Sequence, residues 1–159
     1  MNKQVNLILI LLISVFSYAQ NTDGYTLLFQ DEEPLKIKLK YSNKEMNKKT
    51  NDSTFIETQL SYEQDGVWKD IDVRLRARGN FRRNTCYWPP VRVKIKKSAA
   101  KETIFEGNKS LKLVLPCMME PDRNDNIMKE YMAYKLYEQI SPYHFNARRV
   151  DIDFTEIKG

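Results

Sequence analysis

Alternation between apolar and charged residues is the feature of this chain that most limits its fold. Residues 35–41 read LKIKLKY and residues 71–78 read IDVRLRAR. Because successive side chains of a β-strand point to opposite faces, this pattern is typical of a strand with one buried and one solvated face. It recurs at 91–97 (VRVKIKK), 110–116 (SLKLVLP) and 148–156 (RRVDIDFTE). The chain is therefore expected to build a sheet with an apolar face and a charged face.

Turn-forming residues indicate how these strands connect. A further strand is expected over 54–63, and Asp65-Gly66 favours a tight hairpin to the strand 67–78, because both residues tolerate positive φ. Pro89-Pro90 cannot donate to a sheet and marks the entry to the strand that begins at Val91. The strands are thus expected to follow one another as an antiparallel meander.

Two segments lack a periodic pattern. Residues 42–53 (SNKEMNKKTNDS) are polar and are expected to form a loop. Residues 20–33 contain few apolar residues and are expected to form a leader or an edge strand.

A single main helix is expected over residues 124–140. Its apolar stripe comprises Met128, Met132, Leu136 and Ile140. These residues recur every four positions, so we expect the stripe to lie on the apolar face of the sheet. Tyr131 and Tyr134 lie off the stripe, which suggests that the helix also contacts a second surface. The predicted fold is α+β, an antiparallel β-meander of about five or six strands packed with one main helix.

The N-terminus predicts export. Lys3 is followed by the twelve-residue apolar run VNLILILLISVF and then by Ser17-Tyr18-Ala19, the pattern of a signal peptide over residues 1–19. A retained membrane anchor is the alternative, but a spanning helix needs about 20 apolar residues, so no stable membrane span is expected after cleavage. The mature protein is then periplasmic, cell-surface or extracellular.

Export also bears on the two cysteines, Cys86 and Cys117. Disulfides persist outside the cytoplasm. If strands 91–97 and 110–116 are antiparallel neighbours, the two cysteines lie at the same end of the sheet and can form a disulfide. Two buried thiols are the alternative. Two cysteines and the single histidine, His144, give little support for a metal site.

Positive charge is concentrated in one part of the chain. Residues 72–101 contain ten basic residues and one acidic residue, a net charge of +9, whereas residues 20–71 sum to −3 and residues 102–159 to −2. Fixed cations beside a glycine turn present both charge and backbone N–H groups to an anion. The candidate anion-binding residues are Arg76, Arg78, Gly79, Asn80, Arg92 and Lys94.

Five segments, taken in order, resemble the N-terminal half of the spore-coat-protein-H (CotH) kinase-like family. They are RARGNFRR (76–83), WPPVRVKI (88–95), IFEGNKSLKLVLP (104–116), IMKEYMAYKLYEQI (127–140) and ARRVDIDF (147–154). The resemblance implies that residues 34–159 fold like the ATP-covering N-terminal lobe of a divergent protein kinase. It places Arg78, Gly79 and Asn80, and in a weaker match Lys94, at the phosphates of ATP with Mg.

The same resemblance implies that this lobe is incomplete. The catalytic and metal-binding aspartates of the family lie beyond the strand that here ends at Glu156, and phosphoryl transfer needs such carboxylates. The chain is therefore expected to be inactive alone, with a C-terminal half or a protein substrate as possible partners.

Other interpretations of the basic segment stay open. An arginine-rich strand face is often only a solvated surface that discourages aggregation. A secreted module could instead use Arg74, Arg76 and Arg83 to bind a polyanionic glycan or a phosphate-bearing surface polymer. Nucleic acid is not expected as a partner, because the chain is predicted to be exported and carries no recognisable binding motif. A remnant without activity is the remaining alternative.

Overall fold

A computed structural model describes residues 24–118 and 123–158 of the protein. The strands are β1 (Leu35–Tyr41), β2 (Ile56–Gln64), β3 (Val67–Ala77), β4 (Val91–Ile95), β5 (Ser110–Leu113) and β6 (Val150–Glu156). The helices are α2 (Leu27–Gln30), α3 (Asn43–Lys49), α4 (Asn80–Thr85), α5 (Lys97–Ala100) and α6 (Arg123–Ile140). The α+β prediction is confirmed. The signal peptide predicted over residues 1–19 lies outside the described residues.

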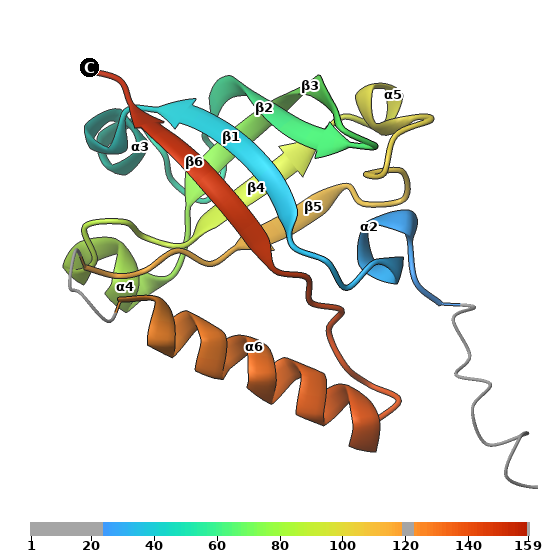
Figure 1. Ribbon diagram of the computed structural model, residues 1–159. Helices are drawn as coiled ribbons and strands as arrows, with labels where there is room; N and C mark the ends of the chain where they lie inside the picture. Colours follow the sequence, from blue (N-terminus) through green and yellow to red (C-terminus); the bar gives the residue numbers. More distant parts are fainter. Residues whose placement is uncertain (1–23, 119–122, 159) are drawn as a thin grey trace, which may run out of the picture.

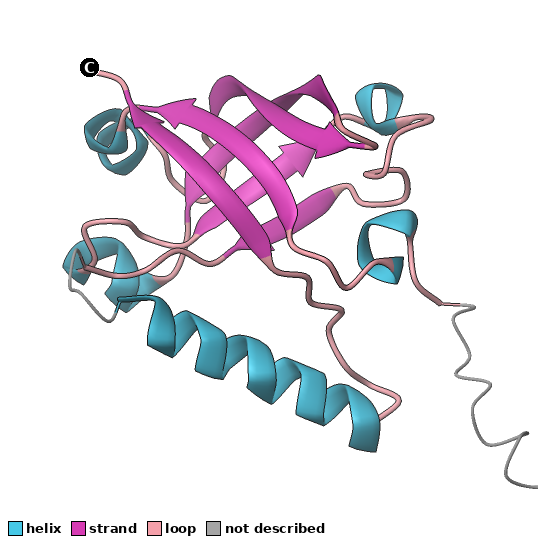
Figure 2. Cartoon of the chain, in the orientation of Figure 1, coloured by secondary structure: helices cyan, strands magenta, loops and turns pink. Residues whose placement is uncertain are grey.

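All six strands form one curled sheet with the order β5-β4-β3-β2-β1-β6 (Figures 1 and 2). Strands β1 to β5 are an antiparallel meander, as predicted. Strand β6 lies outside this meander, because it pairs with β1 in parallel. The reason is the crossover through α6, which returns the chain to the end of the sheet where β1 begins.

The apolar residues of the alternating segments line the inner face of this curled sheet. Leu39, Leu75 and Val91 are fully buried there. Phe105 and Met46, which come from outside the strands, complete the core. The curl lets the sheet bury its inner face largely on itself, and the charged residues of the same strands are left on the outer, convex face.

Two of the predicted connections are confirmed, a hairpin turn and a disulfide. Asp65 and Gly66 have φ of 56° and 77°, as a two-residue hairpin turn between β2 and β3 requires. Cys86 and Cys117 form a disulfide with a Cα–Cα distance of 4.5 Å, which joins the segment before β4 to the segment after β5.

Two segments without periodicity fold into short helices. The loop predicted over 42–53 is wrong for α3, which Ser42 caps by accepting a hydrogen bond from the Glu45 amide (3.3 Å). Met46 anchors this helix in the core, and a seven-residue helix with one apolar anchor has no detectable period. Of the segment 20–33, the described residues 24–33 contain α2 and not an edge strand, and Arg148 holds this helix by donating to the Leu28 carbonyl oxygen (3.0 Å).

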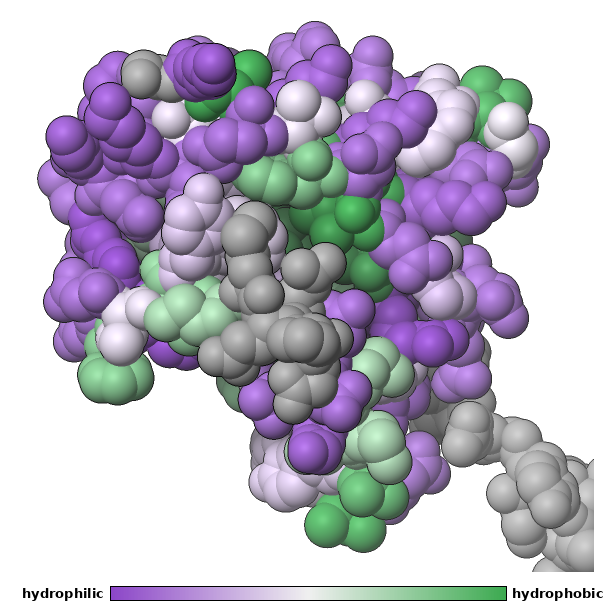
Figure 3. All heavy atoms as spheres, turned by 60° about the vertical axis from the view of Figure 1, so that its left-hand side comes forward, coloured by the Kyte–Doolittle hydropathy of each residue, from purple (hydrophilic) through white to green (hydrophobic). Residues whose placement is uncertain are grey.

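The orientation predicted for α6 is wrong. Met132, Leu136 and Ile140 are 58%, 67% and 80% exposed, so the apolar stripe faces away from the sheet. Figure 1 shows α6 running below the sheet. Figure 3 shows hydrophobic side chains, in green, exposed at the lower end of the molecule. None of the helices within the described residues is both long enough and apolar enough to cross a bilayer.

Polar and aromatic contacts determine this orientation of α6. The Tyr25 hydroxyl donates to Glu138 (2.8 Å), and Lys135 forms ion pairs with Glu138 (3.1 Å) and Glu32 (3.4 Å). Tyr131 lies under the Arg149 guanidinium, with 5.9 Å between the guanidinium carbon and the ring centroid. The second contact surface suggested by the off-stripe tyrosines is thus the face by which the helix attaches.

Acid should weaken this attachment. Burial alone would raise the pKa of Glu138, but the hydrogen bonds from Tyr25 and Lys135 outweigh it and lower the pKa below its ordinary value of 4.5. A carboxyl whose pKa is lower in the folded state stabilises the fold above its unfolded pKa, and this contribution is lost as pH falls through the folded pKa.

We therefore expect the stability difference between the wild type and Glu138→Gln to be largest near pH 7 and to shrink below about pH 4.5. Urea unfolding of both proteins between pH 3 and pH 7 measures it. Taking the difference at each pH removes the contribution of the other carboxyls. A difference that stays constant over this range would contradict the role assigned to Glu138.

Candidate anion-binding site

The register of β3 and β4 places basic residues directly opposite one another on the outer face. Arg74 pairs with Lys94, and Arg76 pairs with Arg92. We call these four residues the basic face. Like charges directly opposite each other destabilise a sheet. The strands therefore hold together a set of cations whose mutual repulsion an anionic ligand would relieve.

Three of these cations make cation–π contacts with the ring of Phe55. Its ring centroid lies 4.8 Å from the Lys94 ammonium, 5.6 Å from the Arg74 guanidinium carbon and 5.7 Å from that of Arg76. Cations are attracted to the negative face of an aromatic ring. The three charged groups consequently converge on one area and are not splayed in unrelated directions.

Phe55 was not among the residues predicted to form the site, although the sequence contains a signal for it. The β2–β3 register pairs Ile56 with Leu75. Extending it by one residue sets Phe55 opposite Arg76 on the outer face. An aromatic residue that opens a strand at an outward position, across from an arginine-bearing strand, is the pattern that could have identified it.

Hydrogen bonding at the basic face is incomplete. Arg76 is paired with Asp52 (2.7 Å), and Arg92 donates to the Ser110 hydroxyl (3.3 Å). The Nε–H groups of Arg76 and Arg92 are buried, and no acceptor for them is found among the described residues. An unpaired buried donor costs about 1–3 kcal/mol.

The charge of the basic face is only partly neutralised. Within the described part of the chain, Arg76 is the member of the basic face that has an acidic partner within 4.0 Å. That partner, Asp52, is 97% exposed, whereas the Arg76 side chain is 14% exposed. An exposed carboxylate of this kind is easily displaced by a ligand, because exposed ion pairs contribute about 0–1 kcal/mol.

The remaining predicted residues lie elsewhere. Arg78 extends the β3–β4 pairing by donating its backbone N–H to Pro90 (2.9 Å). Burial raises the pKa of Tyr134 in α6, and the Arg78 guanidinium opposes that rise. Gly79, with φ of 82°, and Asn80 form the junction between β3 and α4. The predicted set thus divides into Arg76, Arg92 and Lys94 on the outer face and a second group beside α4 and α6.

Two further arginines of the basic segment have structural contacts. Arg82 donates to the Leu115 carbonyl oxygen (3.0 Å), and Arg83 donates to the Thr50 carbonyl oxygen. These bonds hold α4 to the rest of the fold. Arg83, which was a candidate for polyanion binding together with Arg74 and Arg76, is therefore not one of the cations around Phe55.

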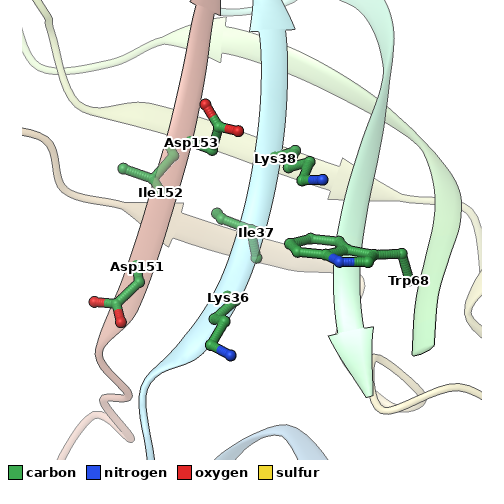
Figure 4. A pocket seen from close by; sticks show the side chains of 7 residues that line it. All are labelled: Lys36, Ile37, Lys38, Trp68, Asp151, Ile152 and Asp153. Atoms are coloured by element: carbon green, nitrogen blue, oxygen red, sulfur yellow. The ribbon is translucent and has the colours of Figure 1, made fainter. Parts of the chain in front are cut away.

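A shallow groove of about 320 Å³ lies on another part of the sheet (Figure 4). It is lined by Lys36, Ile37, Lys38, Trp68, Asp151, Ile152 and Asp153. The Lys38 ammonium sits over the Trp68 ring at 3.9 Å, and Lys36 pairs with Glu63 (2.9 Å). Since its two lysines and two aspartates balance, this groove is a poor site for an anion.

In the described ranges, no three His, Cys, Asp or Glu side chains come together in a way that could hold a metal ion. Comparison of the chain with protein-family models, with curated proteins and with solved structures finds no match.

Proposed function

We propose that this protein is an exported module that binds a polyanion, a sulfated glycan or a phosphate-bearing surface polymer, through the basic face. The observation that carries the proposal is the convergence of Arg74, Arg76 and Lys94 on the Phe55 ring. The disulfide between Cys86 and Cys117 supports export, because such bonds persist in oxidising compartments.

The shape of the site favours a polymer over a small molecule. Small ligands are usually bound in concave, mostly apolar pockets. The basic face lies on the convex side of the sheet, where outward side chains repeat about 7 Å apart along a strand and about 5 Å apart across strands. An extended ligand with an anionic group on each unit can contact several of these cations at once.

ATP with Mg, acting with a C-terminal half or a protein substrate, is the competing proposal that follows from the resemblance to the CotH-like family. Its ligand would contact Arg78, Gly79 and Asn80, which the basic face does not include, and in the weaker match Lys94, which both proposals share. Variants of Arg78 and of Arg74 can therefore separate the two proposals.

Heparin and inorganic polyphosphate are suitable probes for the basic face. We expect both to bind at low salt and to weaken steeply as the salt concentration rises, because binding releases counterions. The variant Arg74→Ala/Lys94→Ala should weaken binding about tenfold, since each exposed cation contributes up to about 1 kcal/mol. Isothermal titration calorimetry at two salt concentrations measures both effects.

Lys129→Ala/Lys158→Ala is the matched control, because it removes the same charge from exposed positions outside the basic face. It should leave the affinity within about twofold of the wild type. Binding that does not depend on salt, or equal losses in both double variants, would refute the proposal. A rise in melting temperature with Mg·ATP that Arg78→Ala abolishes, without polyanion binding, would favour the competing proposal.

A further inference from the structure

Among the described residues the sheet has two edge strands, β5 and β6, and their free edges are not equally protected against further pairing. β5 has four residues and contains Lys112, a short and positively charged edge of the kind that discourages further pairing. β6 has seven residues, VDIDFTE, without proline, lysine or glycine. A long edge strand of this kind presents a row of backbone groups to which another strand can pair.

The hydrogen bonds at the two ends of β6 define its free side. The Leu35 amide donates to the Arg149 carbonyl oxygen (3.0 Å), and the Ile157 amide donates to the Tyr41 carbonyl oxygen (3.2 Å). In a parallel pair of strands, alternate residues of each strand bond to the neighbour. These two hydrogen bonds show that in β6 the odd-numbered residues bond to β1. Val150, Ile152, Phe154 and Glu156 then direct their backbone N–H and C=O groups to the open edge.

The side chains along this edge are also incompletely covered. Val150, Ile152 and Phe154 point to the inner face, yet they are only half-buried, whereas their counterparts on β1 are buried. Phe154 packs against Tyr41 at a ring distance of 4.8 Å. An added strand with apolar residues on its inner face would complete the burial of this side of the core.

The outer face of β6 carries two carboxylates that form no ion pair within 4.0 Å among the described residues. Asp151 and Asp153 are exposed, and their register partners are Lys36 and Lys38. Those lysines contact Glu63 and Trp68 instead, on the side away from β6. The pKa of Lys36 is raised chiefly by its bond to Glu63 and further by Asp151, which acts on it at longer range. Figure 4 shows Lys36 and Lys38 reaching away from β6 and Asp151 reaching to the opposite side, whereas Asp153 lies between β6 and β1.

We propose that the free edge of β6 binds an extended segment of another protein in which apolar and basic residues alternate. Its backbone would pair with the open N–H and C=O groups of Ile152 and Phe154. Its apolar residues would pack beside Val150, Ile152 and Phe154, and its lysines or arginines would lie next to Asp151 and Asp153. Such β-strand addition derives affinity from backbone bonds and specificity from alternate side chains.

A second copy of the same chain fits this edge poorly. Two β6 strands paired antiparallel would set Asp153 opposite Asp153, or Asp151 opposite Asp153, and like charges directly opposite each other are unfavourable. The acidic residues thus oppose self-association and favour a basic partner.

The probe for this inference is an eight-residue peptide in which valine and lysine alternate. We expect it to bind the full-length protein and to slow hydrogen exchange of the Ile152 and Phe154 amides, with little change at Asp153, whose amide already bonds to β1. Two-dimensional NMR measures this exchange residue by residue. The double variant Asp151→Asn/Asp153→Asn should weaken the peptide about tenfold, the effect of two ion pairs near the upper end of the usual range.

Two controls separate strand addition from general attraction between charges. A peptide of four valines followed by four lysines has the same charge without the alternation and should bind at least about tenfold more weakly. Asp70→Asn/Asp72→Asn removes the same charge from the outer face of β3 and should leave the affinity within about twofold. Equal binding of both peptides, equal losses in both double variants, or dimerisation of the protein through β6 would overturn the proposal.

Discussion

Replacing Leu75 by alanine should lower the free energy of unfolding by about 2–5 kcal/mol, the range for removing a buried leucine side chain. Leu75 is 0% exposed and lies on the inner face of β3 between Arg74 and Arg76. The loss arises because the apolar surface of the leucine is no longer buried and because a cavity remains in a closely packed core. Urea denaturation followed by circular dichroism measures the change.

Leu136→Ala in α6 is the matched control for this experiment. Leu136 is 67% exposed, so the same substitution there should change stability by no more than about 0.5 kcal/mol. Folded Leu75→Ala protein should still bind heparin, since its basic face is on the opposite side of the strand. A large loss from Leu136→Ala would mean that the apolar stripe of α6 is buried in solution.

Breaking the disulfide should have an effect of similar size. Cys86 and Cys117 close a loop with a sequence separation of 31 residues, and a loop of this length is expected to stabilise a fold by about 3–4 kcal/mol. The loop contains β4 and β5, so the cross-link restricts in the unfolded chain the segment that supplies Arg92 and Lys94. We expect Cys86→Ser/Cys117→Ser to lower the melting temperature by on the order of 10 °C.

Wild-type protein treated with a reductant should show the same fall in melting temperature as the double serine variant. A thiol assay on the untreated, denatured protein should detect no free cysteine. Two free thiols, or a melting temperature that does not respond to the reductant, would contradict the disulfide and weaken the case for export.

Much of the sheet could be predicted because its inner and outer faces have opposite chemistry. In the segment IDVRLRAR, a shift of one residue would bury Arg74 and Arg76, so the alternation alone determines which side faces the core. The Asp65-Gly66 hairpin was predictable for a similar reason, since few residue pairs accept two positive φ angles. The disulfide followed from placing β4 and β5 side by side.

The features that were missed depend on contacts between distant parts of the chain. The direction of β6 is set by where α6 returns the chain, and no residue of VDIDFTE encodes it. The sequence of α6 has apolar residues on more than one side, and the choice between them depends on Tyr25 and Glu32, about a hundred residues earlier. Hydrophobic periodicity within α6 carries no information about such distant partners.

Only part of the candidate site could be predicted, because the rest of it depends on how the strands pair. Alternation put Arg76, Arg92 and Lys94 on outward positions, and strand pairing then brought them together. Arg78 is the next residue of the alternating pattern after Arg76 and was therefore grouped with these residues. It lies, however, after the end of β3, where the chain turns towards α4. Phe55 became visible only once the β2–β3 register was known.

The way α6 is attached has a consequence for cooperativity. Lifting the helix off the sheet would break the Lys135–Glu32 ion pair, the Tyr25–Glu138 hydrogen bond and ring contacts. It would uncover little apolar surface, because the apolar stripe of α6 already faces water. Its detachment therefore forfeits little of the burial energy that makes the sheet melt as one unit. We therefore expect α6 to separate from the strand layer at a lower free energy than that layer needs to unfold.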